Sequence, residues 1–267
     1  MKNFKITVSY DGRRLAGWQR QAEEAGPTVQ GLLETALSRL CDHPVTLHGS
    51  GRTDAGVHAL GQVASFTTDS ARTVAQIIQG SNALLPPEVA VLRAEEAPED
   101  FHARFSALGK RYDYELLTSP TRRPLYHGRA WWLGPGLDWA AVAAALPAFE
   151  GEKDFAAFQS VGSEVGSTVR RLHRAALSRS GPETLRLSFI GSGFLRHMVR
   201  AMVGLLAETG RGRQSAASIP ELIASGDRRR SGPTAPADGL YLAAVFYDAD
   251  ELAGQVAALT GQAADLL

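Results

Sequence analysis

Between two predicted strands, residues 44–48 and 62–67, the chain reads Gly49-Ser50-Gly51-Arg52-Thr53-Asp54-Ala55-Gly56-Val57-His58-Ala59. The stretch holds one carboxylate, Asp54, among glycines and other small residues that let a large, flat ligand approach the backbone closely. Arg52 and His58 add a positive charge and hydrogen-bonding groups on either side. An aspartate beside glycines also forms Asx-turns, in which its side chain bonds its own backbone. The arginine and the long run of small residues favour the functional interpretation.

The spacing of this loop excludes three familiar motifs. A dinucleotide-binding fingerprint from Gly49 would need a third glycine where Asp54 stands. A phosphate-binding P-loop needs a lysine, and none lies between Lys5 and Lys110. A nucleophile elbow requires Gly-x-Ser-x-Gly, which this stretch does not provide. The loop is therefore predicted to present an acidic residue on a turn.

Composition places the chain among ordinary globular proteins. Its 267 residues suffice for two domains, and 44% of them are hydrophobic and 21% charged. The single cysteine, Cys41, excludes an internal disulfide and fits a reducing compartment. The start has no apolar segment of signal-peptide length. The longest apolar run, Leu240–Tyr247, is far shorter than the roughly 20 residues of a membrane helix. These features predict a cytoplasmic protein with no membrane association.

Charge is balanced overall but uneven along the chain. The net charge is zero, which argues against a general nucleic-acid binder. Yet 24 of the 28 basic residues are arginine, the side chain best suited to bidentate phosphate contacts and to stacking on bases. The clusters are Arg13-Arg14, Lys110-Arg111, Arg122-Arg123, Arg170-Arg171 and Arg228-Arg229-Arg230. Such segregation can create one basic face, although a high arginine content can also reflect genomic composition.

Apolar periodicity predicts two successive α+β halves. Strands are expected at 4–10, 44–48, 62–67 and 89–93, and helices at 29–40, with Thr28 as N-cap, and at 73–85. In the second half, strands are expected at 111–117, 171–178, 184–190 and 240–246, and helices at 139–146, 194–209 and 249–267. This order suggests duplicated RNA-recognition-motif-like domains with antiparallel sheets, although the helix spacing does not exclude a parallel sheet.

The predicted organisation therefore has three parts. Residues 1–107 form an N-terminal α+β domain that carries the Asp54 loop, and residues 108–248 form a C-terminal α+β domain. Residues 249–267 form a terminal tail, helical by its weak periodicity, to which no function is assigned.

Several other residues are candidates for contact with a substrate. On the predicted helix 194–209, Arg196 and Arg200 would share a face. Arg200 lies at the border of the apolar stripe, where it can reach a carboxylate. Tyr112 and Tyr114 would point to one face of a strand beside basic residues, as aromatic side chains that stack on RNA bases do. The candidates for RNA contact near the N-terminus are Arg13, Arg14, Trp18, Gln19, Arg20 and His58.

Each of these groups has a structural alternative. Arginines on a helix can form a solvated face, and tyrosines on a strand usually pack in the core. Trp18 can simply pack as well. The seven histidines show no metal-ligand spacing and Cys41 has no partner cysteine, so no metal site is predicted.

Taken together, seven segments resemble the bacterial tRNA pseudouridine synthase A family. They are Tyr10-Asp11-Gly12 with Gly17-Trp18-Gln19-Arg20-Gln21; Gly51-Arg52-Thr53-Asp54-Ala55-Gly56-Val57-His58; Asp100-Phe101-His102-Ala103-Arg104-Phe105-Ser106-Ala107; Arg111-Tyr112-Asp113-Tyr114; Asp154-Phe155 with Phe158; His197-Met198-Val199-Arg200 with Val203-Gly204; and Ala235-Pro236-Ala237 with Gly239-Leu240-Tyr241-Leu242. They run in order from residue 10 to about residue 247, which is nearly the whole chain.

The resemblance implies an enzyme that isomerises uridine to pseudouridine in the anticodon stem-loop of tRNA, at positions 38–40. It places the nucleophile at Asp54 and an arginine that pairs with it at Arg200. It places a tyrosine that lies against the uracil at Tyr112 and an arginine that helps to hold the flipped-out nucleotide at Arg52. The implied fold has two α+β domains that share a largely antiparallel sheet, with the active-site cleft between them. The implied partners are tRNA and a second copy of the chain, with no metal or cofactor.

One carboxylate is sufficient for this isomerisation, since it needs a nucleophile at C1′ of the ribose or C6 of the base, and both sites of attack stay open. Arg200 would keep Asp54 ionised, and Tyr112 could help to remove the C5 proton. A target base in a paired stem must first be flipped out. Two rival functions are a non-catalytic RNA-binding module and an acid-dependent glycosidase. The glycosidase needs two carboxylates about 5–9 Å apart, whereas the loop holds only one.

Overall fold

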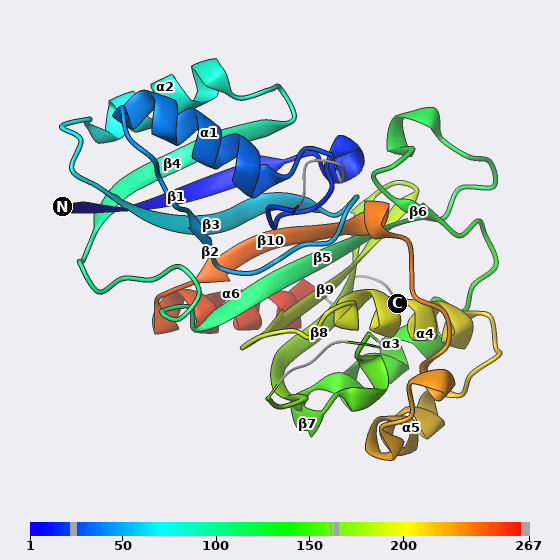
Figure 1. The fold of residues 1–267 in the computed structure, drawn as a ribbon. Coiled ribbons are helices and arrows are strands. Elements are labelled where there is room, and N and C mark those ends of the chain that lie inside the picture. The colour runs from blue at the N-terminus through cyan, green and yellow to red at the C-terminus, as the bar shows by residue number, and fades with distance from the viewer. Residues whose placement is uncertain (22–25, 161, 163–165, 263–267) are drawn as a thin grey trace. The chain divides into compact units, whose positions relative to one another are not determined.

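The chain divides into two compact units (Figure 1). The computed structural model describes residues 1–21, 26–160, 162 and 166–262. Unit 1 comprises Met1–Leu108 and Tyr241–Tyr247, and unit 2 comprises Gly109–Leu240 and Asp248–Leu267. The sequence-based division placed residues 241–247 in the second domain. They join unit 1 because the strand they form pairs in parallel with a strand of that unit, with Tyr241 opposite His58.

Unit 1 is a sheet covered on one face by two helices (Figure 1). Its elements are β1 (Lys2–Tyr10), α1 (Val29–Cys41), β2 (His48–Gly49), β3 (His58–Thr68), α2 (Val74–Leu84), β4 (Val89–Ala97) and β10 (Leu240–Phe246). The strand order is β4-β1-β3-β10, with β2 on β3. β1 runs antiparallel to both neighbours. Alternate residues of β1, namely Phe4, Ile6 and Val8, are fully buried, as the period of a half-covered strand requires.

The helices of unit 1 begin where side-chain caps are available. Thr28 accepts a hydrogen bond from the Gly31 amide and so caps α1, as predicted. Thr73 and Gln76 form a reciprocal capping box at the start of α2. Both α1 and α2 therefore start at positions that the sequence indicates.

The strands around the Asp54 loop differ from the prediction. β2 contains only His48–Gly49, and β3 already begins at His58 rather than at residue 62. The ladder continues further because Tyr10 pairs with Ala59 after a bulge in the β1–β3 register. A bulge shifts the alternation of faces, so this part of β3 lacks the period on which the prediction relied. The loop is thereby shortened to residues 50–57.

Unit 2 is also an α+β unit with mainly antiparallel strands. Its elements are β5 (Gly109–Leu117), β6 (Trp131–Trp132), α3 (Trp139–Ala145), β7 (Gly151–Asp154), β8 (Val169–Gly181), β9 (Thr184–Gly191), α4 (Met198–Gly210), α5 (Ile219–Ser225) and α6 (Ala249–Gln262). The order is β5-β9-β8-β7, and β6 pairs in parallel with β5. The antiparallel pairings of β5 with β9 and of β8 with β9 confirm the predicted α+β class. β6, β7 and α5 were not predicted.

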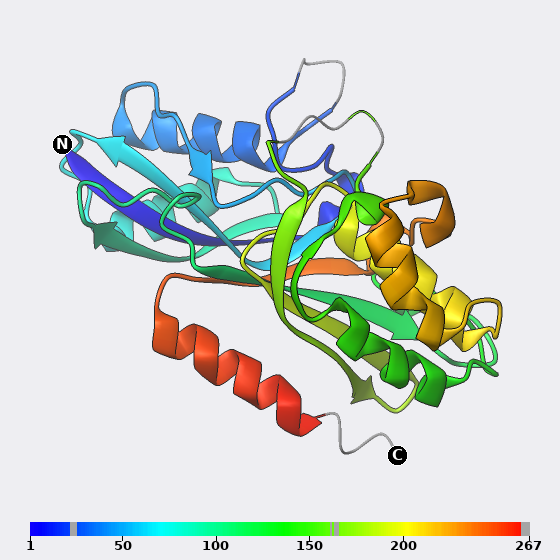
Figure 2. The ribbon, with the colours of Figure 1, turned by 90° about the horizontal axis from the view of Figure 1, so that it is seen from below.

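Two helices of unit 2 have boundaries that differ from those predicted. α4 begins at Met198 rather than at residue 194, because His197 has a left-handed backbone with φ of 64°. Arg196 therefore lies outside the helix and does not share a helical face with Arg200. α6 ends at Gln262, and residues 263–267 of the predicted terminal helix lie outside the described residues. α6 packs along β8 (Figure 2), and Arg111 on β5 donates a hydrogen bond to its Gln255.

Candidate active site

Asp54 lies in a tight turn between β2 and β3. The Val57 amide donates to the Asp54 carbonyl at 3.2 Å, which closes a four-residue turn. Gly56 occupies the third position of the turn with φ of 82°. A positive φ at this position is typical of a type II turn and favours glycine. The backbone thus holds Asp54 in a defined place, while the residue itself stays partly open to solvent.

The base of the loop is fastened to β3. The Ser50 amide donates to the Val63 carbonyl at 2.7 Å, and the Ser50 hydroxyl donates to Oε1 of Gln62 at 2.7 Å. The Gln62 amide in turn donates to the Gly51 carbonyl at 2.9 Å. Ser50 and Gln62 are both fully buried. Since buried polar groups strongly favour being paired, these bonds hold the start of the loop in one conformation.

The centre of the loop is fastened to β1 and to the segment that follows it. The hydroxyls of Tyr10 and Thr53 lie 2.7 Å apart, and the Trp18 amide donates to the Thr53 carbonyl at 3.0 Å. The Trp18 ring packs against Gly49, where a Cβ would lie only 2.5 Å from the ring. Burial raises the pKa of the Tyr10 phenol, so this hydroxyl stays protonated. The residue before Asp54 is therefore held at its backbone and its side chain.

We expect Tyr10→Phe to loosen this turn. The substitution leaves the hydroxyl of Thr53, which is 8% exposed, without its tyrosine partner. We expect a loss of about 1–2 kcal/mol in the free energy of unfolding, measured in urea, since an unpaired buried hydroxyl carries a penalty of this size. Tyr126→Phe, at a tyrosine with 40% exposure, is the matched control and should leave stability unchanged. Equal stability of the two variants would show that the Tyr10 bond does not hold the loop.

Two residues that the sequence suggested for substrate contact have buried side chains. Trp18 and His58 are each 2% exposed. His58 accepts a hydrogen bond from the Gly12 amide at 3.1 Å and stacks on Tyr241, with ring centroids 4.6 Å apart. Most residues of the loop are small, so the large rings of neighbouring residues pack against it. We infer that Trp18 and His58 support the turn, whereas Arg52 is exposed on it.

The two arginines after β1 that are candidates for tRNA contact form ion pairs with nearby carboxylates. Arg13 pairs with Asp11 through two nitrogens, and Arg14 lies 3.8 Å from Glu88. These four side chains border a hollow of about 280 Å³. The hydrogen bond to Asp11 raises the pKa of Arg13, so its charge is retained.

The neighbouring candidates turn toward α1. Gln19 donates to Gln30 at 2.6 Å, and Arg20 lies 3.5 Å from Glu34. Gln19 is half-buried, whereas Arg20 is exposed.

In unit 2, the predicted tyrosines share the buried face of β5. Tyr112 is 7% exposed, and its ring meets that of Phe194 edge-on at 5.0 Å. Tyr114 is fully buried and donates to the Pro236 carbonyl at 2.8 Å. Burial raises the pKa of Tyr114, and Asp238 acts in the same direction. Tyr114 is therefore a core residue, whereas the ring of Tyr112 contacts Phe194 on the segment before α4.

Arg200, in the first turn of α4, is held by the segment that precedes β10. Its Nε donates to the Ala235 carbonyl at 2.8 Å, and the Ala235 amide donates to the Arg200 carbonyl at 3.0 Å. The helix and the segment thus fix the guanidinium at one nitrogen. A guanidinium has a planar set of N–H donors that suits binding to a carboxylate. No local pattern indicates the Ala235 contact, because 35 residues separate the two partners.

A family model for tRNA pseudouridine synthase matches residues 6–106 and 145–248. A tRNA pseudouridine synthase A from Solidesulfovibrio magneticus is 47% identical over 262 residues, which cover 95% of this chain and 94% of the relative. The chain belongs to the tRNA pseudouridine synthase family. Relatives named tRNA pseudouridine synthase A from Geotalea uraniireducens and Aromatoleum aromaticum are 43% and 44% identical. They align over 92% and 91% of this chain and over 100% and 90% of their own lengths.

A solved structure of a Cbf5-Nop10-Gar1 complex also aligns, with 12% identity and a TM-score of 0.36. The alignment covers 76% of this chain and 45% of that one.

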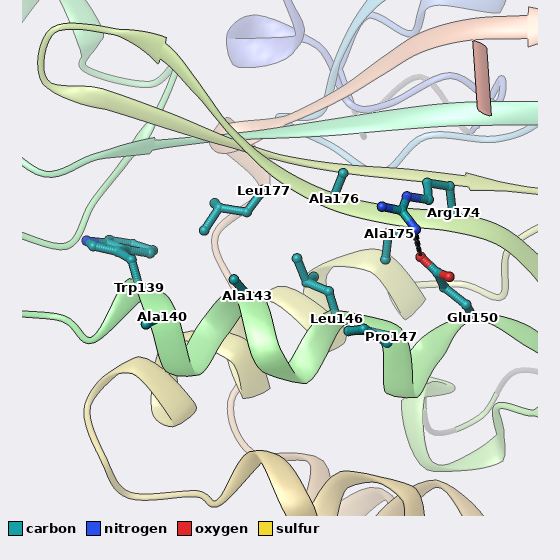
Figure 3. A pocket seen from close by; sticks show the side chains of 10 residues that line it. All are labelled: Trp139, Ala140, Ala143, Leu146, Pro147, Glu150, Arg174, Ala175, Ala176 and Leu177. Atoms are coloured by element: carbon teal, nitrogen blue, oxygen red, sulfur yellow. Dashed lines mark hydrogen bonds and ion pairs between the residues drawn. The ribbon is translucent and has the colours of Figure 1, made fainter. Parts of the chain in front are cut away.

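A separate cavity of about 210 Å³ lies in unit 2 between α3 and β8 (Figure 3). Its walls are mainly apolar, with Trp139 at one end and the ion pair of Arg174 with Glu150, 3.2 Å apart, at the other. None of the residues predicted for this synthase-family site lines it. Among the described residues, no three His, Cys, Asp or Glu side chains are grouped so that they could hold a metal ion. Within the same residues, no helix has the length and apolar character needed to cross a membrane.

Proposed function

We propose that the protein isomerises uridine to pseudouridine in tRNA. The observation that carries this proposal is the Asp54 turn, which presents one carboxylate on a backbone fastened to β1 and β3. It stands in a chain that matches relatives named tRNA pseudouridine synthase A along 91–95% of its length. A fixed nucleophile needs no reorganisation before it attacks a bound nucleotide.

The reaction breaks the bond from N1 of uracil to C1′ and forms a bond from C5 to C1′. The proton of C5 is released and N1 gains one, so the reaction consumes no oxidant, reductant or external energy. The Asp54 carboxylate would act as the nucleophile, at C1′ or at C6. The nucleotide must leave its stack to reach the turn, at a cost of a few kcal/mol.

We propose three supporting roles from the family resemblance. Arg200 pairs with Asp54, and its Nε bond to the Ala235 carbonyl supports this role by fixing the side chain. Tyr112 lies against the uracil and helps to remove the C5 proton. Arg52, exposed beside Asp54, helps to hold the flipped nucleotide. Arg13, Arg14, Gln19 and Arg20 remain candidates for tRNA contact.

The finer features of the proposal also rest on this resemblance. We propose that the targets are uridines 38–40 in the anticodon stem-loop and that the protein acts as a homodimer in the cytoplasm. We propose further that it needs no metal or cofactor.

An unmodified tRNA transcript labelled with tritium at C5 of uridine tests this function. We expect the protein to release tritium at the same rate with and without EDTA. We expect the modified positions, mapped on the product, to fall at 38–40. Binding of the transcript without tritium release would instead indicate a non-catalytic RNA-binding module. Release of free uracil would indicate a glycosidase. Either result would overturn the proposal.

A further inference from the structure

An exposed aromatic residue projects from a turn between β4 and β5 that belongs to unit 1. Phe105 is 76% exposed, although its burial would stabilise the fold by about 1.5–3 kcal/mol. Single exposed apolar side chains are common. What distinguishes Phe105 is the rigidity of its turn and the nature of the side chains next to it.

The turn is fastened to two strands of unit 1. The Ala103 amide donates to the Ser65 hydroxyl on β3 at 3.1 Å, and Tyr247, just after β10, donates to the Ala103 carbonyl at 2.6 Å. Asn3 on β1 donates to the Phe101 carbonyl at 2.9 Å. Ala103 is fully buried, so this residue anchors the turn in one position. Phe105 is therefore held outward, two residues away from this anchor.

His102 closes the turn from within. Its Nδ1 accepts from the amides of Arg104 and Phe105 at 3.1 and 3.4 Å. Partial burial, with His48 and Arg104 nearby, lowers the pKa of His102. The neutral ring that these two bonds require is thereby favoured, so the turn is intact at neutral pH.

Four planar side chains follow one another on this surface. The His48 and His102 rings lie 5.0 Å apart, and the His102 and Phe105 rings 4.5 Å apart. The Arg104 guanidinium lies 5.5 Å from the centre of the Phe105 ring. Flat aromatic and guanidinium groups that remain open to solvent are the groups on which unpaired bases stack.

The turn also has a defined relation to the Asp54 loop. Ser65, to which Ala103 is bonded, is seven residues from His58 on β3. At about 3.3 Å per residue the two points are roughly 23 Å apart. β3 thus connects the Asp54 turn at one end to the Phe105 turn near the other. A tRNA is large enough to contact both.

We propose that Phe105 stacks on an unpaired base of the tRNA and so forms a second RNA contact outside the site of reaction. This inference rests on the proposed function for the identity of its RNA. Glu99 and Asp100 precede the turn and are exposed, so the segment is not strongly basic. Its contact is therefore with a base face rather than mainly with phosphates.

Binding of an unmodified tRNA transcript to Phe105→Ala tests the proposal. We expect the Kd to rise about 5- to 150-fold, which corresponds to the roughly 1–3 kcal/mol of one stacked base. The slope of log Kd against log salt should not change, because no phosphate contact is lost. The kcat at saturating tRNA should stay at the wild-type value. Phe105→Trp should bind as tightly as wild type, since the stacking surface is restored.

The matched control is Leu92→Ala on β4, where a leucine of the same unit is 51% exposed. Its Kd should equal that of wild type. An unchanged Kd for Phe105→Ala, with normal pseudouridine formation, would overturn this inference and leave the proposed function standing. A change in oligomeric state with unchanged tRNA affinity would assign the surface to a second copy of the chain and would also overturn it. Weaker tRNA binding by Phe105→Ala, in a protein whose wild type forms no pseudouridine, would support the RNA contact and refute the function.

Discussion

Asp54→Asn is expected to abolish pseudouridine formation while the protein still binds tRNA. An amide of the same shape lacks the anionic oxygen that attacks the nucleotide, so we expect kcat to fall by about 10³-fold or more. The turn itself should persist, because the bond that closes it joins the Val57 amide to the Asp54 backbone carbonyl. Single-turnover release of tritium from the labelled transcript measures the rate, and filter binding measures the Kd.

The matched control for this substitution is Asp69→Asn. Asp69 belongs to the same unit, its side chain is 78% exposed, and it lies 3.1 Å from His43. Its rate should equal that of wild type. Turnover by Asp54→Asn within tenfold of wild type would remove Asp54 from the mechanism. Normal turnover by both variants would do the same.

Gly204→Ala is expected to destabilise the protein by about 3 kcal/mol, a large effect for one methyl group in a helix. A Cβ at Gly204 on α4 would lie 1.8 Å from the Pro233 carbonyl oxygen. No side-chain rotation relieves this overlap, because the position of the Cβ is set by the helix backbone and the neighbouring atom is a backbone oxygen. The segment that carries Pro233 must move, and it also carries the Ala235 carbonyl that holds Arg200. We therefore expect kcat to fall as well.

Gly254→Ala on α6 provides a control in the same kind of element. A Cβ there meets nothing within 4 Å. Alanine is favoured over glycine in a helix by about 0.5–1 kcal/mol, so this variant should be slightly more stable than wild type. Urea unfolding measures the free energy of unfolding of both variants, which should fall below the wild-type value for Gly204→Ala and rise above it for Gly254→Ala. A Gly204→Ala protein as stable as Gly254→Ala would show that Pro233 does not pack against α4 as described.

Local chemistry made several features predictable. Thr28 caps α1 because its side chain and position suit the first unpaired amides of a helix. The alternation of Phe4, Ile6 and Val8 predicted which face of β1 is buried. Predictions failed where the local pattern was interrupted. The bulge beside Ala59 interrupts the alternation, so the first residues of β3 were not predicted. The left-handed backbone of His197 makes α4 begin later than predicted.

Local sequence patterns predict the α+β class and most of the longer elements, and they indicate Asp54 as the candidate catalytic residue, because periodicity, capping and a glycine-rich turn act between residues that are close along the chain. Which side chains hold that turn, and which residues stay exposed, depends on contacts made in the folded chain. Tyr10 reaches Thr53 across 43 residues, and Ala235 reaches Arg200 across 35. Trp18 and His58 are buried against the loop, whereas Phe105 remains open to solvent. These outcomes depend on packing between segments distant in the sequence, and no local pattern encodes which distant partner a side chain will meet.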